Sequence, residues 1–169
     1  MFKHLVKGSI SFKRYLFLFV VCFFSPVLIA SAQEDTVQNA YIAYYARPAD
    51  PGGLNYWVER LNTSNGSLQG IINEFGSSDE YVSRFSSLSN SELVDNIYQN
   101  LFNRSADNAG LNYYVTRLST GESTLAQIAL NILDGAVGTD STTIANKREV
   151  ADYYTDQLAA GEISYDLSA

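Results

Sequence analysis

Apolar side chains recur along the chain with the spacing of amphipathic helices. Three stripes in its first half each place apolar residues at positions i, i+3, i+4 and i+7, and three stripes in the second half match them at a constant offset. This spacing puts four side chains on one helix face, whereas a strand would alternate with a period of two. We therefore predict an all-α chain. The predicted core residues are Val37, Ala40, Tyr41, Tyr44, Leu54, Trp57, Val58, Leu61, Leu68, Ile71, Ile72 and Phe75, matched by Val94, Ile97, Tyr98, Leu101, Leu111, Tyr114, Val115, Leu118, Leu125, Ile128, Ala129 and Ile132.

The chain is an internal duplication. Residues 47–61 recur as residues 104–118, and ten of the fifteen positions are identical. A repeated unit of this kind buries part of its apolar surface against its neighbour. We expect one all-α domain over residues 33–161, made of two tandem units of three to four helices (about 36–88 and 89–135) and a C-terminal helix (about 142–160). Residues 162–169 would form a tail. The apolar residues expected to hold the C-terminal helix against the core are Ile144, Val150, Ala151, Tyr154 and Leu158.

Boundary signals agree with these helices. Asp50 and Asp107 are placed as N-caps of the second helix in each unit. Gly66 and Gly121 are placed to end those helices in the left-handed region. Two further helix starts are predicted as capping boxes, Ser77 with Glu80 and Ser89 with Glu92.

The first 32 residues have the pattern of a secretory signal peptide. Four cations precede an apolar run that continues to Ile29, and Ala30-Ser31-Ala32 then supplies a small-x-small cleavage pattern. The alternative is a retained membrane anchor, which needs roughly 20 continuous apolar residues. This run is shorter and is broken by Ser25 and Pro26, so we expect cleavage and export to a periplasmic or extracellular compartment.

Composition changes once that segment is set aside. Seven Lys and Arg remain against eighteen Asp and Glu, a net charge of −11, which disfavours nucleic acid and anionic membrane surfaces as partners. Residues 33–169 also contain no Cys and no His. Ser-His-Asp and Cys-His catalytic arrangements and the usual His/Cys zinc sites are therefore excluded, and we expect no enzyme activity and no cofactor.

Carboxylate chemistry remains open in two forms. Asp134 and Asp140 flank a glycine-containing loop that offers oxygen ligands for calcium, although the loop pattern of an EF-hand is absent. The simpler interpretation is that these acids cap neighbouring helices. Paired carboxylates would also allow glycan hydrolysis, but most acids on a small acidic domain form a solvated surface.

Two tyrosine–arginine pairs lie away from the apolar stripes. Tyr56 and Arg60 share a helix face by their i, i+4 spacing, and Tyr113 with Arg117 repeats the arrangement. Aromatic and guanidinium groups suit contacts with protein or sugar, so these four residues are our candidate binding residues. The alternative is that each pair packs under another helix of its own unit.

Other repeated residues are interpreted as structural. Arg47 with Asp50, and Arg104 with Asp107, are expected to form ion pairs that hold the turn before the second helix. Trp57 and its counterpart Tyr114 lie on the apolar stripe and are expected in the core. Gly53 and Gly110 complete the repeated motif.

The motif resembles a known bacterial family. The pattern Arg-x-x-Asp-x-x-Gly-Leu-x-Tyr-[Trp/Tyr]-Val-x-x-Leu, followed by Gly-x-x-Leu and by Ser-Ser-Asp-Glu-Tyr at residues 77–81, is similar to the family called domain of unknown function 4214. That family is distantly similar to the phycobilisome linker domain, an all-α fold. The resemblance implies an exported or surface protein, often in S-layer-like or repeat-bearing architectures, and supplies no catalytic residues.

The sequence thus favours an exported, non-catalytic interaction module that binds a protein or glycan of the cell envelope or extracellular matrix. A calcium-stabilised structural domain is the first alternative, and a carboxylate-based glycan hydrolase is a weaker one. A pigment-linker role conflicts with the export signal and the acidic charge. The sequence leaves the oligomeric state open.

Overall fold

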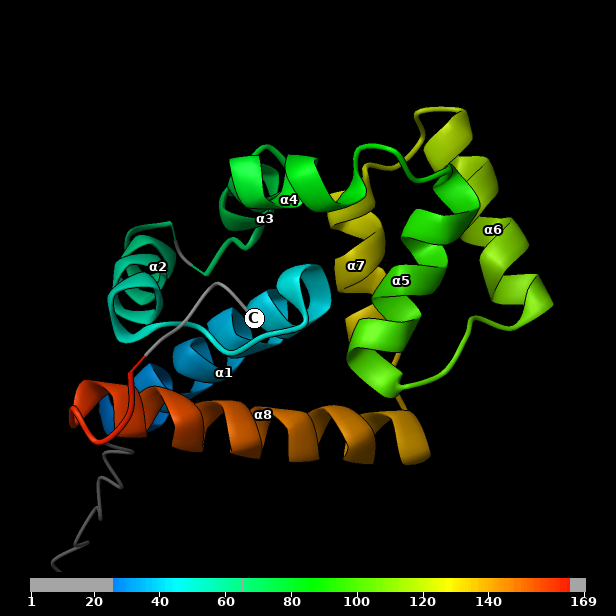
Figure 1. The fold of residues 1–169 in the computed structure, drawn as a ribbon. Helices are drawn as coiled ribbons and strands as arrows, with labels where there is room; N and C mark the ends of the chain where they lie inside the picture. Colours follow the sequence, from blue (N-terminus) through cyan, green and yellow to red (C-terminus); the bar gives the residue numbers. More distant parts are fainter. Residues whose placement is uncertain (1–25, 65, 165–169) are drawn as a thin grey trace, which may run out of the picture.

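The computed structural model describes residues 26–64 and 66–164, with side chains from residue 32 onward, and these residues form helices and loops without a strand (Figure 1). The all-α prediction is confirmed. The helices of the described residues are α1 (Pro26–Tyr45), α2 (Pro51–Thr63), α3 (Gln69–Gly76), α4 (Asp79–Phe85), α5 (Asn90–Phe102), α6 (Asn108–Ser119), α7 (Leu125–Asp134) and α8 (Thr139–Ala159).

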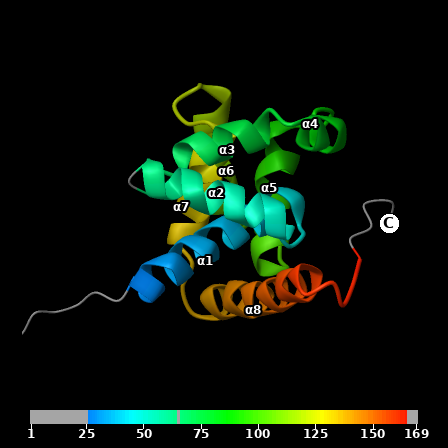
Figure 2. The same cartoon turned by 90° about the vertical axis from the view of Figure 1, so that its left-hand side faces the viewer.

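The first helices of the two units form the centre of the molecule. α1 and α5 pack against each other, and α8 lies along both of them on one side (Figures 1 and 2). All the predicted stripe residues on these two helices are buried. On α1 burial extends to the other faces, including Gln38, Ile42 and Tyr45, because α2, α3, α5 and α8 contact it from different sides.

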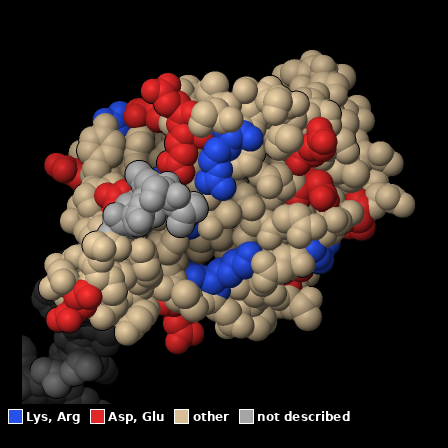
Figure 3. Space-filling model, in the orientation of Figure 1, with Lys and Arg blue, Asp and Glu red and all other residues tan. Residues whose placement is uncertain are grey.

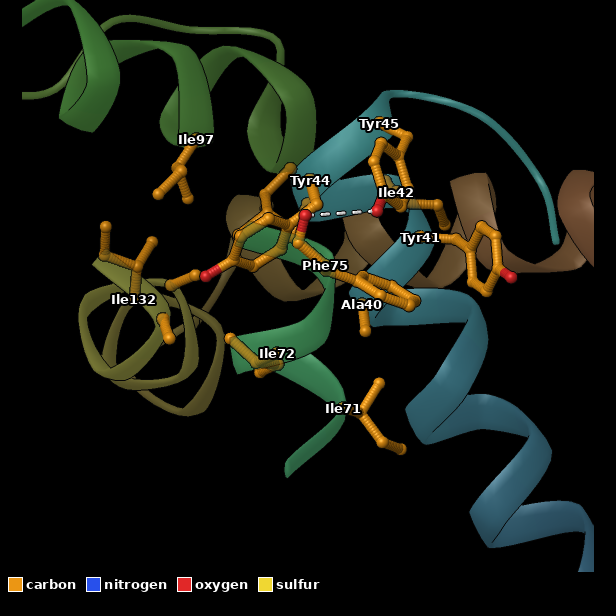
Figure 4. Packing of buried hydrophobic residues seen from close by; sticks show 14 of the residues in the cluster. Ala40, Tyr41, Ile42, Tyr44, Tyr45, Ile71, Ile72, Phe75, Ile97 and Ile132 are labelled. Atoms are coloured by element: carbon orange, nitrogen blue, oxygen red, sulfur yellow. Dashed lines mark hydrogen bonds between the residues drawn. The ribbon is translucent and has the colours of Figure 1, made fainter. Parts of the chain in front are cut away.

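The aromatic part of the core is built around Phe75 of α3. Its ring centroid lies 4.9 Å from those of Tyr41 and Tyr45, 5.4 Å from that of Trp57 and 6.0 Å from that of Tyr44. Figure 4 shows Phe75 among the three tyrosines of α1. Edge-to-face and tilted contacts of this kind are favourable beyond the area they bury. The Tyr45 hydroxyl also donates a hydrogen bond to the Phe75 carbonyl at 3.3 Å. Phe75 therefore joins α1, α2 and α3.

The two copies are covered to different extents at their second helices. In α2, Trp57 and Leu61 are buried, as predicted. In α6, the matching Tyr114 and Leu118 are only partly buried, and no residue of that helix is fully covered. The core predicted from the repeat is therefore correct in position, but the second copy buries less of it.

The predicted N-caps are confirmed except at α4. Asp50 and Asp107 accept from the amides of Gly53 and Gly110, each at 2.8 Å, and Ser89 with Glu92 forms a capping box at α5. The predicted Ser77–Glu80 capping box is wrong, because Ser78 caps α4 by accepting from Tyr81 N at 3.1 Å. Ser78 is held there by a 2.9 Å hydrogen bond with the Tyr45 hydroxyl.

The C-terminal helix begins at Thr139, slightly earlier than predicted, and the left-handed Gly161 follows its end. Ile144 and Ala151 are buried as expected, but Val150 is 68% exposed, so its predicted place in the core is wrong. Thr155 is buried where Val150 was expected to be. It lies one helical turn after Ala151, so both residues face α1.

A buried polar network attaches α8 to the first unit. The Gln38 side chain is fully buried, and its Nε2 donates to Thr155 Oγ1 at 2.8 Å. Gln38 Oε1 accepts from Ala49 N at 3.0 Å, and Thr155 Oγ1 donates to Ala49 O at 2.7 Å. Buried polar groups are costly unless hydrogen-bonded, so this network fixes how α1, the α1–α2 turn and α8 meet.

Most of the predicted signal peptide, residues 1–25, lies outside the described residues, and its last seven residues form the start of α1. Within residues 26–64 and 66–164, no helix combines the length and the apolar character needed to cross a membrane.

Candidate functional site

The structure places the first predicted tyrosine–arginine pair on the surface of α2. Arg60 Nη1 donates to the Tyr56 hydroxyl at 2.8 Å, and the guanidinium carbon lies 5.1 Å from the ring centroid. Arg60 Nη2 also binds Glu74 Oε1 of α3 at 2.9 Å. Tyr56 remains 48% exposed, so the ring is positioned by Arg60 while one part of it stays accessible.

The second pair has the same stacked geometry on α6. The Arg117 guanidinium carbon lies 5.0 Å from the Tyr113 ring centroid, and Tyr113 is 53% exposed. Arg117 Nη2 binds Glu122 Oε1 at 2.9 Å. The carboxylate partner therefore comes from a different place in each copy, α3 in the first and the α6–α7 loop in the second, while the Tyr–Arg contact is kept.

The two pairs do not share a continuous surface. α2 and α6 lie on opposite sides of the α1–α5 centre in Figure 1. The molecule therefore presents two separate Tyr–Arg faces, one for each copy, and a ligand that contacts both must be extended or multivalent.

The repeated arginine before the second helix binds an acid other than the predicted one. Arg47 Nε and Nη2 donate to Glu80 Oε1 and Oε2 of α4 at 3.0 and 2.8 Å, and its guanidinium lies 5.1 Å from the ring centroids of Tyr41 and Tyr45. The predicted turn ion pair with Asp50 is wrong in its acidic partner, because the Asp50 carboxylate caps α2. We call this two-bond contact between arginine and acid an arginine bridge.

The second copy repeats the bridge. Arg104 Nε and Nη2 donate to Asp140 Oδ1 and Oδ2 of α8 at 2.9 and 2.5 Å, and the guanidinium lies 5.2 Å from the Tyr98 ring centroid and 5.7 Å from that of Phe102. The predicted partner Asp107 is again an N-cap. Glu80 and Asp140 are each the second residue of their helix, so the acid of the bridge has the same helical position in both copies.

Both bridges depend on ionised carboxyls. Hydrogen bonding to Arg47 lowers the pKa of Glu80, and hydrogen bonding to Arg104 lowers the pKa of Asp140. A carboxyl whose folded pKa lies below its unfolded value stabilises the fold at higher pH, and that contribution is lost as the pH falls through the folded pKa. The bridges are therefore intact at neutral pH and weaken in acid.

Glycine in the repeated motif is explained by a close approach of the first helix of each copy, α1 at Gly53 and α5 at Gly110. A Cβ atom added to Gly53 would lie 2.3 Å from the hydroxyl oxygen of Tyr41, and one added to Gly110 would lie 3.0 Å from that of Tyr98. Tyr41 is buried, and burial first, then Asp50, raises its pKa to about 12. The ring therefore has little room to move away from α2.

This contact predicts unequal costs for the same substitution in the two copies. We expect Gly53→Ala to lower the free energy of unfolding by about 1–2 kcal/mol through overpacking, and Gly110→Ala to have a smaller effect. Chemical denaturation of both variants measures the difference. An equal loss at both positions would show that the distance to the tyrosine hydroxyl does not set the cost of the substitution.

A groove of about 730 Å³ opens where the C-terminal ends of α1 and α5 meet α8. Its size falls in the range of small-ligand sites. Figure 3 shows this face of the molecule hollowed, with Lys and Arg side chains on the margins of the hollow. No acidic residue of the described chain lines it. The lining residues are Ile42, Ala46, Arg47, Pro48, Gln99, Asn100, Asn103, Thr143, Asn146, Lys147, Val150 and Ala151.

Lys147 differs from the other basic residues in its partners. Of the seven Lys and Arg in residues 33–169, six form ion pairs within the described residues, and Lys147 forms none there. Its ammonium donates to the carbonyls of Asn100 and Gln99 at the end of α5, at 2.5 and 3.4 Å. Partial burial lowers its pKa. A positive charge therefore lies in the groove without a neutralising carboxylate from the described chain.

The predicted calcium ligands are not arranged as a cation site. Asp140 is bound through both oxygens to Arg104, while Asp134 is the last residue of α7. Among residues 26–64 and 66–164 there is no cluster of three or more His, Cys, Asp or Glu that could hold a metal.

A second, smaller hollow of about 340 Å³ carries acids. Asp35, Glu149 and Asp152 line it together with Arg148, which binds Asp35 at 3.3 Å. Burial first, and then Asp35, raises the pKa of Asp152. Because Arg148 compensates Asp35, this hollow is a partly neutralised acidic surface of α1 and α8.

Part of the chain matches a known protein family. Residues 72–136 match the model of a family described as Domain of unknown function (DUF4214). This stretch of the chain is similar to the DUF4214 family. The matched stretch runs from Ile72 in α3 to just beyond α7 and is less than half of the chain. It contains Arg104 and the Tyr113–Arg117 pair of the second copy, and ends before α8. No curated protein and no solved structure gives a significant match to the chain.

The groove and the true partners of the bridge arginines were missed by sequence reasoning. The groove forms only where three helices meet, and its amide side chains carry no periodic signal. One clue was available: α8 contains the lone lysine of residues 33–169, next to Asn146 and near the exposed Val150. The position of Glu80 and Asp140 just after a helix start was a second clue.

Proposed function

We propose that this chain is an exported, non-catalytic interaction module that helps to build a cell-surface or extracellular assembly by binding a protein or glycan. The observation that carries the proposal is the repeated Tyr–Arg geometry. In each copy a half-exposed tyrosine is stacked on an arginine that a carboxylate also holds. Aromatic rings and guanidinium groups held in place on a surface are typical binding hot spots, because little rotamer entropy is lost on contact.

The residue types of the chain support a non-catalytic role. Residues 33–169 have neither the imidazole nor the thiol that most acid–base and nucleophilic mechanisms use. The groove between α1, α5 and α8 has no carboxylate in its lining, so it lacks the paired acids that a glycan hydrolase needs. The calcium alternative has less support, because Asp140, one of its two candidate ligands, is paired with Arg104. Binding without chemistry is the function that these arrangements support best.

Export and partner binding are tested together in the producing cell. The variant Tyr56→Ala, Arg60→Ala, Tyr113→Ala, Arg117→Ala should keep its helicity, since the tyrosines lie outside the core, and should lose most of its retention on the envelope fraction. Fractionation with immunoblotting measures the retention, and circular dichroism measures the fold.

A matched control is provided on the same two helices. Glu59 and Asn112 are exposed neighbours of the pairs, and their replacement by alanine should leave retention unchanged. Retention of the fourfold variant at the wild-type level would contradict the proposed role. A large loss of melting temperature would instead assign the pairs to stability.

A further inference from the structure

The groove between α1, α5 and α8 has the make-up of a peptide site. Its most deeply buried lining residues, Ile42 and Ala151, are apolar. Around them lie the amide side chains of Asn103 and Asn146, and that of Asn100, whose Nδ2 donates to Ala43 O at 2.9 Å. An amide side chain carries one carbonyl acceptor and an NH₂ donor, which are the groups that pair with a peptide main chain. No aromatic side chain of the described residues lines this groove, so it lacks a stacking platform for a sugar ring.

The charge of the groove indicates which class of peptide it would bind. The described residues include many acids, yet the charged residues that line the groove are both basic, Arg47 and Lys147. Arg47 is engaged by Glu80, whereas Lys147 has no carboxylate partner in the described residues. Two carbonyls at the end of α5 accept from its ammonium, which leaves a third donor. Desolvation lowers the pKa of Lys147, because burial disfavours the charged ammonium. A bound carboxylate would stabilise the charged form and so oppose this effect.

We propose that this groove binds a short acidic peptide segment, with an Asp or Glu carboxylate at Lys147 and the main chain against the amide side chains. Val150, 68% exposed at the edge of the groove, then contacts an aliphatic side chain next to the acid. The inference rests on the proposed non-catalytic binding role and adds a second site with a defined ligand class. It needs neither Tyr–Arg pair.

An array of capped seven-residue peptides of varied sequence tests the proposal on the full chain. Bound peptides should be enriched in Asp and Glu, and replacing the acid of a bound peptide by its amide should weaken binding about tenfold. Val150→Glu places a carboxylate at the groove without disturbing the core, and should also weaken binding about tenfold. Val137→Glu is the matched control, because Val137 is 77% exposed and does not line the groove.

Lysine variants test the charge itself. Lys147→Arg should keep the acidic preference, and Lys147→Met should abolish it, with melting curves showing that both variants fold. Peptide selection without acid enrichment, selection that is unchanged in Val150→Glu, or binding of uronate-containing glycans without any acidic peptide would each overturn the proposal. Envelope retention of the Tyr–Arg variants is a separate measurement, so failure of the peptide site and failure of the proposed function give different results.

Discussion

Replacing Phe75 with alanine should lower the free energy of unfolding by about 3–5 kcal/mol, the range found for buried aromatic truncations. Phe75 is 3% exposed, and four aromatic rings from α1 and α2 surround it. Truncation would leave a cavity where α1, α2 and α3 meet. Three of these rings belong to α1 at the centre of the fold, so the neighbours cannot close the cavity without moving the core. Urea denaturation followed by circular dichroism measures the loss.

Phe85 provides the matched control for this substitution. It is also buried, at 8% exposed, but it lies in the short α4 and its one described ring contact is with Tyr81, at 4.9 Å between centroids. Phe85→Ala should therefore cost clearly less than Phe75→Ala. If the two variants lose equal stability, the aromatic cluster around Phe75 is not the main packing centre.

Gln38→Leu should be the second most damaging change, with a loss of about 2–3 kcal/mol although it puts an apolar side chain in a buried place. Gln38 Oε1 is the acceptor for the Ala49 amide, and its Nε2 donates to Thr155. Leucine leaves the buried Ala49 amide without a partner, and an unsatisfied buried group costs about 1–3 kcal/mol. Hydrogen exchange should show the Ala49 amide and the C-terminal half of α8 opening more often.

The repeat supplies an internal control for this prediction. Asp95 is the counterpart of Gln38, and its Oδ1 accepts from the Ala106 amide at 2.8 Å. Because Asp95 is only partly buried, water can replace the lost acceptor in Asp95→Leu, and we expect a loss under about 1 kcal/mol. Equal losses at the two positions would contradict the role of Gln38 in docking α8.

The fold was predictable from sequence because the duplication repeats the positions of the three apolar stripes. Val37 and Val94, or Ile72 and Ala129, lie on the same face in both copies, so periodicity was enough to place them. Val150 was misplaced because α8 has no counterpart stripe to compare with. Thr155 was missed because a buried threonine depends on a partner, Gln38, that lies 117 residues away.

The site was less predictable than the core. The face of Tyr56 and Arg60 followed from helix geometry, because residues four apart are neighbours in any helix. The partner of Arg47 did not, since the nearest acid in sequence, Asp50, was already needed as an N-cap and the arginine turned to Glu80 on another helix. Long-range ion pairs depend on how helices are placed, and sequence spacing alone does not report that placement.

In each copy an arginine bridge joins the turn after the first helix to a later helix, α4 in the first copy and α8 in the second. Double-mutant cycles test it most directly, with Arg47→Met and Glu80→Gln in one cycle and Arg104→Met and Asp140→Asn in the other. We predict a coupling free energy of about 1 kcal/mol in both cycles at neutral pH, and a smaller one in acid. Coupling in the first cycle with none in the second would show that the bridge does not act as a repeated element of the two copies.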